Sequence, residues 1–150
     1  MIAVIQRVSQ ASVQIEGLKQ GSIQAGFMIL LGITHSDSTE DASWLAKKIA
    51  GMRIFSDTEG KMNLSLSEVK GEILLISQFT LHASTKKGNR PSFIEAARPE
   101  QAIPFYEQLI VLLEKELVIS IQTGKFGADM KVSLINDGPV TILIDSKNRI

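Results

Sequence analysis

A glycine–proline pair near the end of the chain, Gly138-Pro139, most constrains how this sequence can fold, because strand-forming residues flank it on both sides. Proline fixes its own φ and has no N–H to give to a sheet, while glycine adopts backbone angles that other residues avoid. The pair can leave carbonyl oxygens that no neighbouring strand uses, and an X-Pro bond accepts the cis geometry at modest cost. Two interpretations follow: a recognition element beside a regular sheet, or an ordinary turn between strands at residues 131–135 and 140–144.

The composition fits one ordinary globular domain, because 150 residues, 44% of them hydrophobic, are enough to bury a sizeable core. We therefore expect a single domain over residues 1–150. The longest apolar run, residues 27–31, is too short to span a bilayer, and no charged segment followed by an apolar one opens the chain. These features predict a cytoplasmic protein without a membrane partner.

Cysteine is absent, which excludes a disulfide framework, a thiolate nucleophile and a cysteine-based zinc site. The two histidines, His35 and His82, lie far apart in the sequence and have no carboxylates at a recognisable metal-binding spacing. We expect neither a metal nor another cofactor.

The charges of the chain balance, with 16 basic and 16 acidic side chains. A net charge of zero argues against a general nucleic-acid binder that relies on a large positive field, so any contact with RNA must be local. The best candidate is the loop that carries Lys86, Lys87 and Arg90, with Arg98 a little further on. The alternative is a solvated surface loop without a partner.

Alternation of apolar and polar residues predicts many short strands. They occupy residues 1–8, 12–15, 22–24, 27–33, 53–56, 61–63, 72–81, 119–122, 131–135 and 140–144. Most of the connections between them have the length of a hairpin loop.

Two helices complete the expected fold. A capping-box pattern at residues 38–41 precedes an apolar face at helical spacing, made of Ala42, Leu45, Ala46, Ile49 and Met52. Pro99 lies near the start of the second helix, whose apolar face is Phe105, Leu109, Leu112, Leu113 and Leu117. The pattern predicts an α+β fold with a mixed or mostly antiparallel sheet system covered by two helices.

The predicted strand at residues 72–81 carries the most concentrated polar group, Ser77-Gln78-Phe79-Thr80-Leu81. On a strand, Gln78, Thr80 and His82 share one side. Thr80 as a nucleophile with His82 as its base needs a contact near 3 Å, whereas Cα atoms two residues apart on a strand are about 6.5 Å apart. No third residue is evident to orient the imidazole. The alternative is that Thr80 hydrogen-bonds within the strand and His82 is exposed at its end.

Ser77-Gln78-Phe79-Thr80 and Asn136-Asp137-Gly138-Pro139-Val140-Thr141 together resemble the motif pair of the D-aminoacyl-tRNA deacylases, formerly named D-tyrosyl-tRNA deacylases. The resemblance covers the whole chain, including the blocks at residues 3–8, 53–57 and 88–93. It implies the fold of that family, with a barrel-like core under two helices. His82 departs from the pattern, because a small residue is expected at its position.

The resemblance implies a homodimer with active sites at the subunit interface, which hydrolyses the ester between a D-amino acid and the terminal adenosine of tRNA. In such a dimer the Gly138-Pro139 bond is cis and reaches into the partner's site, where backbone atoms exclude the side chain of an L-amino acid. Asn136 and Thr141 belong to this motif, and Arg7 is expected to hold it in orientation, its alternative being a surface charge at a strand end. Glycyl-tRNA, including glycine mischarged on alanine tRNA, is then a substrate as well.

For the chemistry, the resemblance implies a site built from Ser77, Gln78, Phe79 and Thr80 that needs no cofactor. The backbone N–H of Thr80 polarises the ester carbonyl, and the 2′-hydroxyl of the adenosine helps to activate water. An older alternative makes the Thr80 hydroxyl the nucleophile.

The resemblance also implies a grip on the tRNA end. Phe126 and Met130 bind the adenine, although without the resemblance both are interpreted as core residues. Lys86, Lys87 and Arg90 meet phosphates of the acceptor end.

Two functions from other classes remain as alternatives. One is a nucleic-acid-binding homodimer of the same fold without hydrolytic activity, which the zero net charge and the intact Gly138-Pro139 motif disfavour. The other is an interaction domain like the editing module of archaeal threonyl-tRNA synthetases, for which this chain has no synthetase body.

Overall fold

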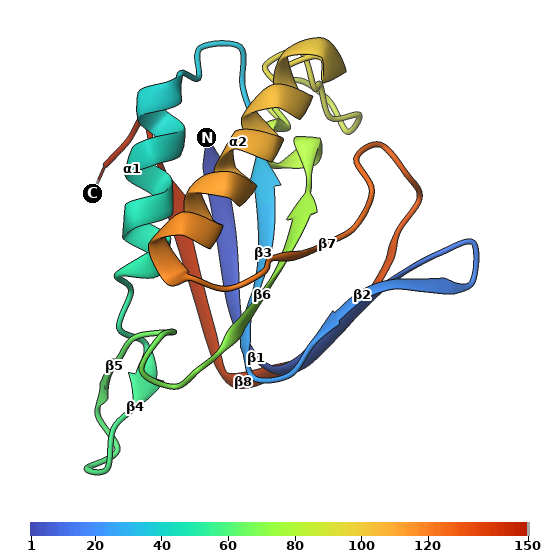
Figure 1. Ribbon diagram of the computed structural model, residues 1–150. Helices are drawn as coiled ribbons and strands as arrows, with labels where there is room; N and C mark the ends of the chain where they lie inside the picture. Colours follow the sequence, from blue (N-terminus) through green and yellow to red (C-terminus); the bar gives the residue numbers. More distant parts are fainter. Residues whose placement is uncertain (150) are drawn as a thin grey trace.

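The computed structural model of the chain describes residues 1–149. Figure 1 shows a strongly twisted sheet with two helices lying side by side on one of its faces. The helices are α1 (Thr39–Ala50) and α2 (Pro99–Leu117), and a single 3₁₀ turn covers Phe79–His82. The strands are β1 (Ile2–Ile15), β2 (Leu18–Ile23), β3 (Gly26–Gly32), β4 (Phe55–Ser56), β5 (Met62–Leu64), β6 (Glu72–Ser77), β7 (Gln122–Thr123) and β8 (Lys131–Asp145).

Strand β1 organises the main sheet. Its first half pairs antiparallel with β3, its second half pairs antiparallel with β2, and β8 runs antiparallel to it along nearly its whole length. The pairs β3–β6 and β6–β7 are parallel, so the sheet is mixed, as the strand pattern predicted. The sheet also curls toward closure, because a Cβ on Gly21 of β2 would lie only 2.9 Å from the Thr123 carbonyl oxygen of β7. The predicted α+β class with a barrel-like core under two helices is confirmed.

Both helices begin where the sequence predicted. The Ser38 N–H donates to the Asp41 carboxylate over 2.9 Å, which satisfies one of the free donors at the start of α1. Pro99 is the first residue of α2, where its missing N–H removes no helical hydrogen bond. Their buried faces meet the sheet through Ala42, Leu45, Ala46 and Ile49 of α1, and through Ala102, Tyr106, Leu109, Leu113 and Leu117 of α2. Neither helix within residues 1–149 combines the length and apolarity needed to cross a bilayer.

The Gly138-Pro139 pair does not form a turn between two strands, so the ordinary-turn interpretation is wrong. Residues 131–145 form one strand, and likewise residues 2–15, predicted as two strands, form one. Each long strand absorbs its irregular residues as a bulge: the β1–β8 register shifts between Gln6 and Val8 and again between Val8 and Gln10. Because each of these strands pairs with a long neighbouring strand, it stays continuous across residues that on their own predict the end of a strand.

The predicted strand at residues 72–81 is too long. It ends at Ser77, and the next residues turn as a 3₁₀ helix, so Gln78, Thr80 and His82 do not share the side of a strand. The Gln78 N–H closes the pairing by donating to the Leu31 carbonyl over 2.7 Å. The turn then folds back over Gly32, where a Cβ would lie 3.0 Å from the Leu81 Cβ. The missing side chain of Gly32 makes room for this turn.

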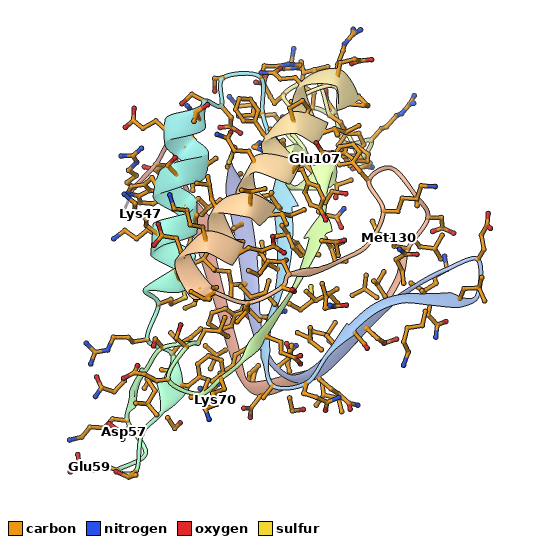
Figure 2. The ribbon with its side chains drawn as sticks, viewed as in Figure 1. Lys47, Asp57, Glu59, Lys70, Glu107 and Met130 are labelled. Atoms are coloured by element: carbon orange, nitrogen blue, oxygen red, sulfur yellow. The ribbon has the colours of Figure 1, made fainter. Side chains whose placement is uncertain are left out.

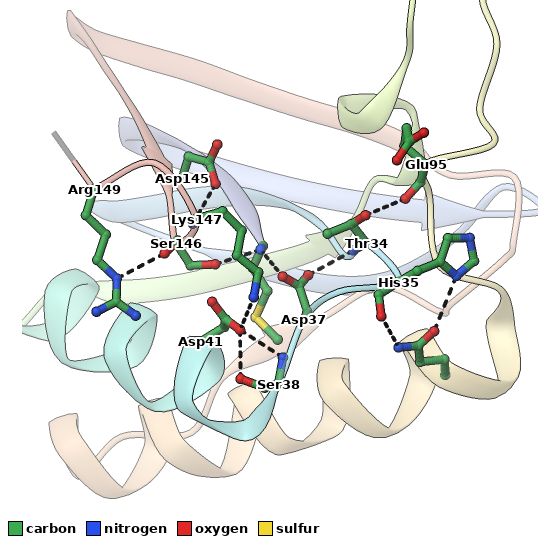
Figure 3. Close-up of polar contacts among 12 residues, drawn as sticks. Thr34, His35, Asp37, Ser38, Asp41, Glu95, Asp145, Ser146, Lys147 and Arg149 are labelled. Atoms are coloured by element: carbon green, nitrogen blue, oxygen red, sulfur yellow. Dashed lines mark hydrogen bonds and ion pairs between the residues drawn. The ribbon is translucent and has the colours of Figure 1, made fainter.

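A polar cluster ties both ends of the described chain to the start of α1 (Figure 3). The Met1 ammonium donates to Asp37 and to the Ser146 hydroxyl, and the Thr34 N–H donates to the second oxygen of Asp37. Close by, the Lys147 ammonium lies 2.7 Å from the buried Asp41 carboxylate. Although burial by itself raises the pKa of Asp41, hydrogen bonds from Lys147, Ser38 and Ser146 outweigh it and hold that pKa well below its ordinary value.

Asp41→Asn is therefore expected to lower the free energy of unfolding at pH 7 by about 1.5–3 kcal/mol, the range for hydrogen bonds to a charged group. A depressed folded-state pKa stabilises the protein at pH values above the unfolded-state pKa of ~3.9, and this stabilisation is lost as the pH falls through the folded-state pKa. Urea denaturation should thus give a clear difference between variant and parent at pH 7 and a smaller one at pH 3. Asp129→Asn is the control, because among the described residues Asp129 forms an ion pair only with the exposed Lys131. An equal difference in stability at both pH values would contradict a stabilising role for the charged Asp41 carboxylate.

Candidate functional site

A cavity of about 590 Å³ opens where three segments meet: the turn after β6, the start of α2 and the loop from β7 to β8. Ser77, Gln78 and Phe79 line it from the turn. Phe126 and Met130 line it from the loop, and Figure 2 labels Met130 where the loop enters β8. The fold thus brings three of the predicted catalytic residues and both predicted adenine-binding residues to one cavity. Thr80, the second residue of the same turn, is exposed and is not part of the cavity wall.

The turn after β6 begins with two backbone N–H groups on exposed residues. Phe79 and Thr80 are its first residues, and within residues 1–149 their N–H groups donate to no other protein atom. The first N–H groups of any helical turn lack partners in the helix, so this geometry follows from where the turn begins. Two neighbouring free donors can hold an oxygen on which negative charge develops.

The Thr80 hydroxyl has a different neighbour from the one considered in the sequence. The Gln78 Nε2 amide donates to the Thr80 Oγ1 atom over 2.5 Å, and His82 makes no contact of this kind. The expectation that His82 is exposed at a strand end is also wrong. His82 is half-buried against Gly32, and its Nε2 atom is buried without a hydrogen-bond partner among the described residues. Within residues 1–149, therefore, no side chain that could act as a general base hydrogen-bonds to the Thr80 hydroxyl.

Phe126 packs against Tyr106, a residue that no sequence pattern singled out. The Tyr106 ring packs edge-to-face against the Phe126 ring, with 6.0 Å between their centroids. The Tyr106 hydroxyl donates to the Leu75 carbonyl over 2.8 Å, two residues before Ser77. Burial raises the pKa of Tyr106, so the hydroxyl keeps its proton and remains a donor. Helical spacing predicted Phe105 on the apolar face of α2, and one step further along the helix Tyr106 is the more buried residue.

Gly138 and Pro139 lie in the bulge of β8, at the protein surface, and neither lines the cavity. Their peptide bond is cis. Gln6 pairs with Thr141 and Val8 pairs with Asn136, so residues 137–140 face only Arg7 on the neighbouring strand. A Cβ on Gly138 would lie 2.9 Å from the Val140 Cγ2 atom, and the φ of Gly138 is +130°, so glycine is required here for space and for conformation.

Arg7 is buried against this bulge, with only 8% of its surface exposed. Its Nε atom donates to the Asp137 carbonyl over 2.9 Å, and its Nη1 atom donates to the Ile54 carbonyl over 2.6 Å. The guanidinium thus joins the residue before Gly138 to the segment that enters the β4–β5 hairpin. Its interpretation as a strand-end surface charge is wrong, because the side chain is enclosed and hydrogen-bonded.

The remaining predicted contacts are at the surface. Thr141 donates through its hydroxyl to Gln6 on β1, and Asn136 is exposed. Lys86, Lys87 and Arg90 are exposed on the loop that a pair of hydrogen bonds between Ser84 and Ser92 closes, and they do not line the cavity. Arg98 does line it, at the start of α2.

No group of three or more histidine, aspartate and glutamate side chains within residues 1–149 is arranged to hold a metal ion.

Comparison with known proteins identifies the family of this chain. The family model described as D-Tyr-tRNA(Tyr) deacylase matches residues 4–145. A protein of Cytophaga hutchinsonii named D-aminoacyl-tRNA deacylase is 68% identical over 99% of both chains. Proteins of the same name from Flavobacterium johnsoniae and Akkermansia muciniphila are each 60% identical over 99% of both chains.

Solved structures show the same fold. A c-Myc DNA unwinding element binding protein is 42% identical, with a TM-score of 0.89, over 97% of this chain and 98% of that chain. A probable eukaryotic D-amino acid tRNA deacylase is 15% identical, with a TM-score of 0.81, over 95% of this chain and 97% of that chain, and at this identity it supports the fold alone. The family model and the three bacterial relatives show that the chain belongs to the D-Tyr-tRNA(Tyr) deacylase family of hydrolases.

Proposed function

We propose that this protein hydrolyses the ester bond of D-aminoacyl-tRNA and releases the free D-amino acid and the tRNA. The observation that carries the proposal is the cavity: Phe79 lines it from the turn whose first two backbone N–H groups have no protein partner within residues 1–149, and Phe126 and Met130 line it from the loop between β7 and β8. The first feature suits the carbonyl of an ester, and the second suits a nucleobase. Such a reaction belongs in the cytoplasm, where tRNA is aminoacylated.

In the proposed reaction a water molecule adds to the ester carbonyl carbon. The negative charge that develops on the carbonyl oxygen is held by the N–H groups of Phe79 and Thr80, each worth about 3–4 kcal/mol at most in such a role. The C–O bond to the terminal ribose then breaks, and the ribose oxygen leaves with a proton that came from the water. The neighbouring 2′-hydroxyl of the substrate helps to orient and activate the water, because no side-chain base lies beside Thr80. Ser77 and Gln78 shape the approach to the turn.

Phe126 and Met130 would hold the terminal adenine by stacking and by sulfur–aromatic contact. Lys86, Lys87 and Arg90 would meet the phosphates of the acceptor end, although they lie outside the cavity wall. Their exposure leaves them free to move toward an extended nucleic acid, and their contribution to binding should weaken as salt rises.

We further propose a homodimer in which the Gly138-Pro139 element of one protomer completes the cavity of its partner. Three features support this arrangement. The element is exposed and lies outside the cavity of its own chain, and β8 pairs only with β1 among the described residues. The same strand exposes 52% of Ile135 and 64% of Leu143, an apolar surface that another chain can cover. Fixed backbone atoms at Gly138 and Pro139 would exclude an L side chain, and glycine would be accepted.

A second candidate is a nucleic-acid-binding dimer without hydrolytic activity, since one solved structure of this fold is a DNA unwinding element binding protein. The balanced charge of this chain gives such a role little electrostatic support. The free donors of the turn would also have no purpose in it.

The proposal predicts that D-tyrosyl-tRNA is hydrolysed and L-tyrosyl-tRNA is not, with rates that differ roughly a hundredfold or more, because a backbone clash cannot relax as a flexible side chain can. Both esters are measured side by side at one enzyme concentration and one salt concentration, with glycyl-tRNA as a third substrate that should also be hydrolysed. Equal rates for the D and L esters would contradict exclusion by Gly138 and Pro139, and no hydrolysis of any ester would favour the binding protein.

Thr80→Ala separates the two mechanisms. If the backbone N–H groups act, the variant should keep its rate within roughly tenfold, because alanine preserves the N–H and loses only the contact with Gln78. If the hydroxyl is the nucleophile, the rate should fall by about four orders of magnitude or more. Single-turnover deacylation of D-tyrosyl-tRNA measures the chemical step, and Thr80→Ser is the matched control that retains a hydroxyl.

Arg7→Lys tests how the Gly138-Pro139 element is oriented. Lysine keeps the charge but cannot donate to the Asp137 and Ile54 carbonyls at once, so the element should loosen and the preference for the D ester should fall roughly tenfold. The ratio of kcat/KM for the two tyrosyl-tRNA esters is the measurement. Arg53→Lys is the control, because Arg53 is exposed and, in the part of the chain that the structure describes, hydrogen-bonds only to Asn63. An unchanged ratio in Arg7→Lys would refute this role for Arg7.

A further inference from the structure

Gly124 directly follows β7, at a position where the backbone does not require glycine. Its φ lies outside the positive range that favours glycine, unlike those of Gly127 and Gly138. The reason for a glycine at this position must therefore be space rather than conformation.

The space beside Gly124 is filled by the side chain of Met130. A Cβ on Gly124 would lie 2.3 Å from the Met130 Sδ atom, far inside contact distance, and 3.3 Å from the Cδ1 atom of Ile76. Val13 closes the remaining side, with its Cγ2 atom at 3.6 Å. The thioether thus lies on the bare backbone of Gly124, in a seat whose other walls are buried side chains.

The backbone of this seat has little freedom to retreat. Thr123, the residue before Gly124, pairs with Leu75 of β6 on one side. On the other side, Gly21 of β2 approaches so closely that its own Cβ would lie 2.9 Å from the Thr123 carbonyl oxygen. A side chain added at Gly124 must therefore displace Met130 rather than the strand.

We propose that Gly124 is a positioning residue for substrate binding: its missing side chain seats the Met130 thioether in the wall of the cavity. The inference rests on the proposed function, in which Met130 holds the terminal adenine. Ile76 and Val13 are buried beside Gly124, so a displaced thioether moves toward the cavity, which Met130 and Ile76 line. Gly124 sets the depth of the adenine site without touching the substrate.

Gly124→Ala is the test, because its backbone can adopt the same conformation and the long methionine side chain can yield. We expect KM for D-tyrosyl-tRNA to rise by roughly threefold to tenfold, the range of a lost sulfur–aromatic contact, with kcat and the unfolding midpoint nearly unchanged. Gly51→Ala is the matched control, since Gly51 has an ordinary φ of −86° and lies at the end of α1.

A double-mutant cycle with Met130→Val shows whether the effect passes through Met130. Valine ends before the position of the sulfur, so Gly124→Ala should raise KM in the parent and leave it unchanged in the Met130→Val background. An equal rise of KM in both backgrounds would overturn the proposal.

The ¹³C-labelled ε-methyl signal of Met130, assigned by its loss in Met130→Val, follows the side chain independently of activity. It should shift in Gly124→Ala and stay in place in Gly51→Ala. A shifted signal in a protein that hydrolyses no ester would leave the seating intact and refute the proposed function. An unmoved signal together with an unchanged KM, in a parent that does hydrolyse D-tyrosyl-tRNA, would refute the role of Gly124.

Discussion

The hydrogen-bonded pairing of β1 with strands on both of its edges is the constraint on which the rest of this structure depends. Because β8 follows β1 over nearly its whole length, residues that would otherwise break a strand are kept in line, and the surplus backbone is pushed out as a bulge. The same pairing buries Arg7 beneath that bulge. On its other edge β1 holds β3, and β3 in turn fixes where β6 ends and the turn toward Thr80 begins.

The resulting site uses backbone geometry more than side-chain chemistry. A glycine at position 32 admits the turn after β6, a glycine at position 138 admits the bulge, and a glycine at position 124 admits the Met130 thioether. Each of these positions is defined by what lies within about 3 Å of the missing side chain. A chain with no net charge can therefore still form a specific cavity, because close contacts at these glycines, rather than strong electrostatic interactions, determine its shape.

Much of the fold followed from the sequence because local signals and tertiary contacts agreed. The capping box at Ser38 and the proline at the start of α2 each have a direct physical meaning, and both helices lie where those signals placed them. The predictions were wrong in two kinds of place. At Gly138-Pro139, pairing with a partner strand keeps the strand continuous although the local sequence predicts a turn. Beyond Ser77, the strand-like sequence continues but the strand ends. The site was accessible only in part. The motifs named Phe126 and Met130. The contact between Tyr106 and Phe126 joins two segments that are distant in the sequence, and the spacing of residues along one helix cannot predict such a contact.

The position of Gly138 and Pro139 outside the cavity of their own chain has a genetic consequence in the proposed dimer. Each cavity would be formed by one polypeptide, and the Gly138-Pro139 element that gives it stereochemical selectivity, its filter, would come from the other. In a cell that makes both the normal chain and a chain with a damaged filter, a mixed dimer would then contain one cavity that rejects L esters and one that does not. A lesion in the filter would spread its effect to normal copies, whereas a lesion in the turn after β6 would silence only the chain that carries it.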